Sequence, residues 1–294
     1  MKKIKLIKST FLNEKEVRKK LSNFILNADF LSMGKQCKLF EKEFSKFQFR
    51  DHSLMVNSGS SANLALIQAM MNLGWLKIGD KVAFSSLTWS TNVMPIIQLG
   101  LIPIPIDINL ETLNVDSDNF KNTLTREPDI KAFFISNILG FCSDIDVLSD
   151  ICKANQIYLI EDNCESLGSV FKETKLGNFG IASTFSSYVG HHLSTIEGGV
   201  ICTDHEDLAN MICMVRAHGW DRNLSEVFKE TLKNKHKIND FYDLYTFYEL
   251  AYNIRPTEIN GFIGVTQLSA IAESINIRES HYKSLNTSIV KNHN

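Results

Sequence analysis

Short apolar runs alternate with amphipathic segments along most of this chain. The runs Leu54–Val56, Lys81–Ser85, Ile102–Ile106 and Gly199–Thr203 are bounded by glycine, asparagine or aspartate, which is typical of buried strands. Segments of about ten residues with helical periodicity lie between most of them. Strands separated by such helices indicate crossover connections, and these predict a mostly parallel sheet covered by helices on both faces, which is an α/β fold.

Helical periodicity also marks the two ends of the chain. Residues 13–27 and 36–49 predict two helices, and the second carries phenylalanines along one face. Beyond Thr257 apolar residues again recur at helical spacing, and we expect a single helix to run from there to Leu285.

Composition and charge narrow the class of protein. The 294 residues could form one large or two ordinary domains, and 44% apolar with 22% charged residues is ordinary for a globular protein. A net charge of -2 gives no reason to expect nucleic acid or a membrane as a partner. The start of the chain is polar and no apolar run reaches eighteen residues, so we expect a cytoplasmic protein. The six cysteines are scattered without CxxC pairs, which favours reduced thiols over a metal site.

Three connections carry candidate chemistry. Residues 57–64 form a glycine- and serine-rich turn that opens a helix, and free N–H groups there suit a phosphate, although a plain helix cap has the same pattern. Asp162 follows a predicted strand at 156–160, where open parallel sheets bind ligands. His191 and His192 lie on a polar, glycine-flanked connection before Gly199, and such a pair can be structural or catalytic.

The motifs around these connections resemble those of the DegT/DnrJ/EryC1/StrS family of sugar aminotransferases, which depend on pyridoxal phosphate (PLP). Residues 185–199 are similar to the family pattern F-S-F-x-x-x-K-x-L-x-T-G-E-G-G, residues 161–168 to E-D-x-A/C-x-x-x-G, and residues 252–259 to Y-N-x-R-x-T-E-I. His191 stands where the family has its cofactor-linking lysine, and Ile196 stands where it has a glycine. In this respect the chain resembles the family's branch of 3-dehydratases, which act on nucleotide-linked 4-keto-6-deoxy sugars.

The resemblance implies the fold of PLP-dependent transferases of fold type I, the aspartate aminotransferase-like class. Residues 1–250 would form the PLP-binding large domain, and residues 251–294 a connecting helix and the start of a C-terminal small domain that is otherwise absent from this sequence. The active-site residues of the family are expected at matching positions.

The resemblance assigns a role to each matching residue. The residues expected to contact the cofactor are Ser60, Ser61, Trp89, Asp162, Glu165, Ser186 and Asn253. Among these, Asp162 would pair with the pyridine nitrogen and Trp89 would stack on the ring. Asn253 would reach the cofactor phosphate of a neighbouring subunit, which implies a homodimer. Glu165 stands where relatives have glutamine or aspartate.

A catalytic cycle follows from the resemblance. Glutamate would convert PLP to pyridoxamine phosphate (PMP), whose amine would join the C4 ketone of the sugar. His191 would then move the proton that lets the C3 hydroxyl leave. Because histidine cannot form the covalent link that lysine forms, dehydration is favoured over amino transfer.

Two alternatives stay open. One is a sugar-nucleotide aminotransferase, and the other is a noncatalytic homologue that binds cofactor or sugar nucleotide, which the departures at Glu165 and Ile196 allow. A related group of CDP-linked hexulose 3-dehydrases holds an iron–sulfur cluster on four cysteines that follow the histidine. Only Cys202 and Cys213 follow it here, so no such cluster is expected.

Overall fold

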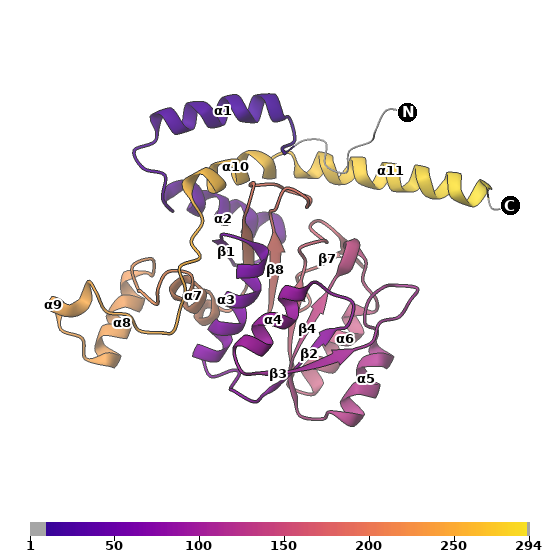
Figure 1. The fold of residues 1–294 in the computed structure, drawn as a ribbon, viewed down its shortest axis with the longest axis horizontal. Helices are drawn as coiled ribbons and strands as arrows, with labels where there is room; N and C mark the ends of the chain where they lie inside the picture. Colours follow the sequence, from indigo (N-terminus) through magenta and orange to yellow (C-terminus); the bar gives the residue numbers. More distant parts are fainter. Residues whose placement is uncertain (1–9, 293–294) are drawn as a thin grey trace.

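The computed structural model describes residues 10–292, and these form a seven-stranded sheet between layers of helices (Figure 1). In spatial order the strands are β1 (His52–Val56), β9 (Gly199–Thr203), β8 (Ala182–Ser186), β5 (Tyr158–Asp162), β4 (Ile130–Ser136), β2 (Lys81–Ser85) and β3 (Ile102–Ile106). Within this sheet β9 is antiparallel to both neighbours, and the other pairs are parallel. The predicted α/β fold with a mostly parallel sheet is confirmed.

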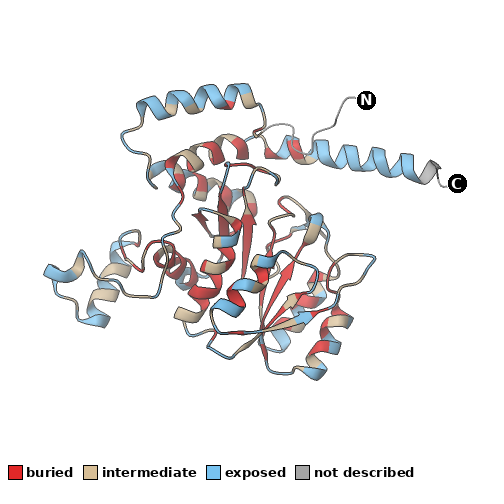
Figure 2. Cartoon of the chain, in the orientation of Figure 1, coloured by how far each residue is buried: buried red, intermediate tan, exposed pale blue. Residues whose placement is uncertain are grey.

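Helices cover both faces of the sheet. Successive residues of a strand point to opposite sides, so each central strand contributes to two core clusters. Ala132 and Phe134 of β4 pack in one core cluster, and Phe133 and Ile135 pack in another. The covering helices are α3 (Gly59–Asn72), α4 (Ser90–Gln98) and α7 (Glu206–Val215) on the first face, and α5 (Ser117–Arg126) and α6 (Ile145–Ala154) on the second. Figure 2 shows most of the sheet buried between these layers, whereas the edge strand β3 is largely exposed or half-buried.

The two ends of the chain pack together on the second face. They form α1 (Glu14–Asn27), α2 (Lys35–Gln48), α10 (Glu258–Leu268) and α11 (Ile271–Asn292). The buried Glu258 carboxylate accepts N–H groups from Gly34, Gln36 and Cys37, which caps the start of α2. Only the start of α11 lies on the body of the protein, with Ile271 and Ser274 buried, and residues 276–289 extend away from it with exposed side chains (Figure 2).

The prediction of a single helix from Thr257 to Leu285 is wrong, because the helix is broken between α10 and α11. The Ser269 hydroxyl donates to the Thr266 carbonyl, and the Ala270 N–H donates to the Gln267 carbonyl, so the turn tightens there. This change of direction buries Ile271 in the core. The division into residues 1–250 and 251–294 stays a prediction.

Smaller elements complete the described part of the chain. They are the 3₁₀ turn η1 (Ile138–Gly140), the hairpin of β6 (Val170–Phe171) and β7 (Thr174–Lys175), and the projecting helices α8 (Glu226–His236) and α9 (Asp240–Asp243). Among residues 10–292 no helix combines the length and apolar character needed to cross a membrane.

Candidate active site

A cavity of about 690 Å³ lies at the carboxyl ends of β4, β5 and β8. Its lining comes from the start of α3, the segment before α4, the ends of these strands, the connection between β8 and β9, and α11. Six of the eight predicted site residues line it: Ser60, Trp89, Asp162, Glu165, Ser186 and His191. Residues from positions 60 to 191 meet there because parallel strands present their carboxyl ends at one edge.

Ser61 and Asn253 are not among the lining residues of this cavity. The Ser61 N–H and hydroxyl both contact Ser58 Oγ, at 3.0 and 2.9 Å, so Ser61 takes part in the cap of α3. Asn253 Oδ1 accepts from Arg255 Nε at 3.0 Å, next to an isolated bridge with Ala217. Their roles toward a phosphate stay predictions.

Asp162 is a buried carboxylate held by neutral groups alone. Its Oδ2 accepts from Asn63 Nδ2 at 3.0 Å and from Asn92 Nδ2 at 2.8 Å, and its Oδ1 accepts from the Cys164 N–H at 2.9 Å. Asp162 is 7% exposed and forms no ion pair with any residue that the structure describes. A buried anion of this kind is costly without a cation. It therefore provides a site for a positively charged group of a ligand.

Sequence reasoning missed the two asparagines. Each lies in the first two turns of its helix, and nothing in its local sequence shows that its side chain turns toward Asp162. The available signal was the position of Asn63 within residues 57–64, the segment predicted to bind a phosphate.

The start of α3 and the end of β8 approach each other closely beside Asp162. A Cβ at Gly59 would lie 2.7 Å from the Ser186 Cβ, and one at Gly199 would lie 2.2 Å from the Ser58 carbonyl oxygen. Only glycine permits this approach at both positions. It brings the Ser60 and Ser186 side chains to one wall of the cavity, next to the positive end of α3.

Hydrogen bonds fix the connection that carries the histidines. The Ser187 N–H donates to the Gly198 carbonyl and the Thr195 N–H to the Ser187 carbonyl, both at 2.8 Å, and the Ser187 and Thr195 hydroxyls are 2.6 Å apart. Ile196, at the predicted glycine position, has φ 75°, a conformation that is strained for a β-branched residue. The connection is thus closed at its base, and both histidines line the cavity.

The two histidines differ in their electrostatic surroundings. Burial lowers the pKa of His191 below its usual value, and the carboxylates of Glu165 and Asp162 oppose this change. Burial lowers the pKa of His192 further, to about 4, and the charge of Arg278 adds to the effect. His192 Nδ1 is buried and has no hydrogen-bond partner. Both rings are therefore neutral near pH 7, and His191 is the one that carboxylates favour as a proton acceptor.

Glu165 also positions the loop that follows β4. Its Oε2 accepts from the Leu139 N–H at 2.9 Å, where Leu139 has a left-handed φ of 54°. The carboxylate thus holds η1 against the cavity while it acts on His191. The motif did not predict that a glutamate at this position would hold the loop after β4.

A family model for the DegT/DnrJ/EryC1/StrS aminotransferases matches residues 13–294. The chain belongs to this family. GDP-4-keto-6-deoxy-D-mannose 3-dehydratase of Yersinia pseudotuberculosis is 36% identical over 87% of this chain and 65% of its own length, and the Escherichia coli O55:H7 protein of that name is 36% identical over 87% and 66%. The chain thus spans just under two thirds of the length of these relatives.

A solved structure of an E. coli GDP-4-keto-6-deoxy-D-mannose 3-dehydratase with bound hydrated PLP is also similar, with a TM-score of 0.87. It is 35% identical and is matched over 96% of this chain and 71% of its own length. The resemblance of fold and motifs to this family is confirmed.

No lysine among the described residues lines the cavity, although the family pattern places one at the position of His191. The nearest upstream lysines are bound elsewhere. Lys172 Nζ lies 2.6 Å from Asp146 Oδ2, and Lys175 Nζ donates to the Phe47 carbonyl and lies 3.6 Å from the centre of the Phe47 ring. The structure therefore brings no alternative amine from these two positions to the cavity.

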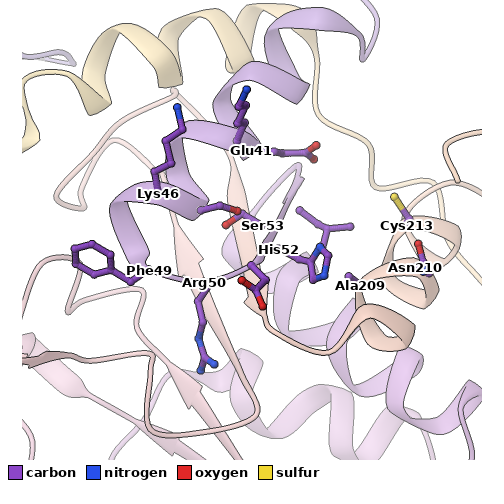
Figure 3. Close-up of a pocket in the computed structure, with 13 residues that line it drawn as sticks. Glu41, Lys46, Phe49, Arg50, His52, Ser53, Ala209, Asn210 and Cys213 are labelled. Atoms are coloured by element: carbon purple, nitrogen blue, oxygen red, sulfur yellow. The ribbon is translucent and has the colours of Figure 1, made fainter. Parts of the chain in front are cut away.

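A second hollow of about 650 Å³ lies between α2, β1 and α7 (Figure 3). None of the predicted site residues lines it. Arg50, at its edge, donates to the Gly177 and Gly180 carbonyls and pairs with Asp204, and Glu41 pairs with the buried Arg216. These groups are engaged in holding the edge of the sheet, so the hollow is not the candidate active site.

Proposed function

We propose that this protein binds PLP and PMP and acts as a 3-dehydratase on a nucleotide-linked 4-keto-6-deoxyhexose, with glutamate as the amino donor. The observation that carries the proposal is the cavity in which His191 takes the position of the family's lysine and no described lysine replaces it. The relatives at 36% identity are named as dehydratases of such a sugar, which supports the same reaction class here.

The cavity fits the cofactor on several counts. A pyridinium N–H would supply the cation that the buried Asp162 carboxylate does not have among the described residues. The phosphate would lie at the start of α3 with the Ser60 and Ser186 hydroxyls, and Trp89, which is 72% exposed beside the cavity, would cover the ring. Glu165 is placed to act on His191 and on the 138–140 loop.

When bound, the cofactor supplies an amine that joins the sugar ketone and a cationic ring that withdraws electrons from the reacting carbon. The chain supplies the proton transfer. His191, neutral near pH 7, would accept the proton from the C4′ carbon of the cofactor and then donate it to the C3 hydroxyl as this leaves. Asp162, fixed by Asn63 and Asn92, would hold the ring charge throughout.

A homodimer belongs to this proposal, since Asn253 would contact the cofactor of a partner subunit. The segment that precedes it exposes large apolar side chains: Phe241, Tyr242, Leu244, Tyr245, Phe247 and Leu250. Exposed apolar groups in this number are typical of an interface. The six cysteines are all free thiols, which agrees with a cytoplasmic location.

Mass spectrometry of the product tests the proposal. The protein is incubated with PLP, glutamate and GDP-4-keto-6-deoxymannose, and we expect a sugar nucleotide that has lost the C3 oxygen and contains no added nitrogen. An amino sugar would establish the aminotransferase alternative. No turnover of any nucleotide-linked 4-keto-6-deoxy sugar, together with retained PLP binding, would favour the noncatalytic alternative.

A further inference from the structure

A cation on α11 has no assigned role in the reaction described above. Arg278 lines the cavity together with His191, His192, Glu165 and Glu197. It is the one arginine or lysine among the cavity-lining residues that the structure describes. Its guanidinium group is therefore the cation that these residues offer to a negatively charged group of a ligand.

The packing of α11 directs Arg278 to this place. Ile275 presses on the loop after β5, since a Cβ at Gly168 would lie 2.3 Å from Ile275 Cδ1. Arg278 follows Ile275 by three residues and so lies on the same face of the helix, one turn further along. Ile271 and Ser274, which come before Ile275 in the same helix, are buried and anchor the helix.

Arg278 has no acceptor of its own within the described part of the chain. It forms no ion pair and donates no hydrogen bond there, although two carboxylates line the same cavity. Its charge acts on His192, whose Nδ1 is buried without a partner. The exposed Arg278 and the partly buried His192 thus offer two nitrogen-bearing side chains that have no hydrogen-bond partner among the described residues.

The proposed reaction brings three kinds of anion to this cavity. The start of α3 with Ser60 and Ser186 suits the cofactor phosphate. The carboxylates of the amino donor and the diphosphate of the sugar nucleotide still need a donor. A guanidinium matches both groups, because its N–H donors fit two oxygens at once.

We infer that Arg278, with His192 beside it, forms a binding site for a substrate oxyanion, either a carboxylate of the amino donor or the diphosphate of the sugar nucleotide. This inference rests on the proposed function for the identity of the anions. The site recognises the non-reacting end of a substrate, and it leaves proton transfer to His191.

Binding measurements on the PLP-loaded protein test the site without turnover. The probes are glutarate, a dicarboxylate with no amine to react with the cofactor, and guanosine diphosphate, each titrated by calorimetry. Arg278→Gln should weaken one of the two probes about tenfold or more, the effect of losing a charge-assisted contact. The probe that is weakened identifies the source of the anion.

A matched control is Arg126→Gln, because Arg126 is an exposed arginine near the end of α5 that does not line the cavity. It should leave both affinities unchanged. Arg278→Lys, which keeps the charge and loses the paired donors, should fall between wild type and Arg278→Gln.

Unchanged affinities for both probes in Arg278→Gln would overturn the inference. A loss of PLP affinity in Arg278→Gln as large as the loss of probe affinity would also overturn the inference, since the anion bound by Arg278 would then be the cofactor's own phosphate. The proposed function fails separately: a protein that binds a probe through Arg278 and makes no dehydrated sugar keeps the anion site and loses the dehydratase assignment.

Discussion

Replacing Asp162 with asparagine isolates the charge that we expect to pair with the cofactor ring. The substitution keeps the shape of the side chain and removes its negative charge. In the structure the Asp162 carboxylate has neutral donors only, from Asn63, Asn92 and Cys164, so no protein cation shares its charge among the described residues. The full charge is therefore available to a pyridinium group.

The expected size follows from the value of a hydrogen bond to a charged group, about 1.5–3 kcal/mol. Because each 1.4 kcal/mol is a tenfold change, PLP should bind Asp162→Asn roughly 10- to 150-fold more weakly. Titration of the apoprotein with PLP, followed by the absorbance of the bound cofactor, measures this directly. Thermal unfolding of both proteins shows whether the fold is retained.

Asp116→Asn is the matched control. Asp116 also accepts a backbone N–H and an asparagine amide, from Asn119 at 2.9 Å and Asn109 at 3.0 Å, and it caps α5 away from the cavity. This variant should bind PLP as wild type does. Equal PLP affinity in wild type and Asp162→Asn would refute the ring pairing.

Three further substitutions test other parts of the structure. Ile196→Gly should raise the free energy of unfolding, measured in urea, by about 1 kcal/mol, because it relieves the backbone strain of a β-branched residue in a left-handed conformation. Ile196 is 44% exposed, so little packing is lost, and an unchanged or lower stability would contradict this. Glu41→Leu should destabilise it by about 3–5 kcal/mol, because the Arg216 side chain, 3% exposed, loses its ion-pair partner, and a loss below 1 kcal/mol would contradict this. The pKa of His192 is lowered to about 4, so its neutral ring contributes stability above pH 6.5 that is lost as the pH falls towards 4. His192→Asn should therefore lose less stability than wild type between pH 7 and pH 4.5, and equal losses would contradict the buried neutral ring.

The sequence predicted the strands well where turn residues bounded them. The runs at Lys81–Ser85, Ile102–Ile106 and Gly199–Thr203 have the predicted limits, because glycine or aspartate stands at their ends. The predicted helix beyond Thr257 was too long, since periodicity continues across the turn at Ser269, where a single hydroxyl and a tighter hydrogen bond redirect the chain. The spacing of apolar residues does not show where the helix breaks.

Motifs identified the residues that the cavity brings together, including Asp162 at the end of β5 and His191 in the connection that follows β8, because each lies in a recognisable segment. They did not identify groups that act through tertiary contact. Asn63 reaches Asp162 from 99 residues away, and Arg278 enters the cavity on a helix whose position depends on the packing of Ile275. Such pairings depend on the packing of whole elements, which periodicity does not describe.

The dehydration rate of His191→Asn tests the central claim most directly. The variant keeps a polar side chain of similar reach and leaves Ser60, Ser186 and Asp162 in place, so PLP affinity should stay within about twofold of wild type. Loss of a positioned acid–base group typically costs about 10² to 10⁴ in rate. We therefore predict that loss of the C3 hydroxyl, followed by mass spectrometry under single-turnover conditions, slows by at least two orders of magnitude. An undiminished rate in His191→Asn would show that another group moves the proton, and it would contradict the account.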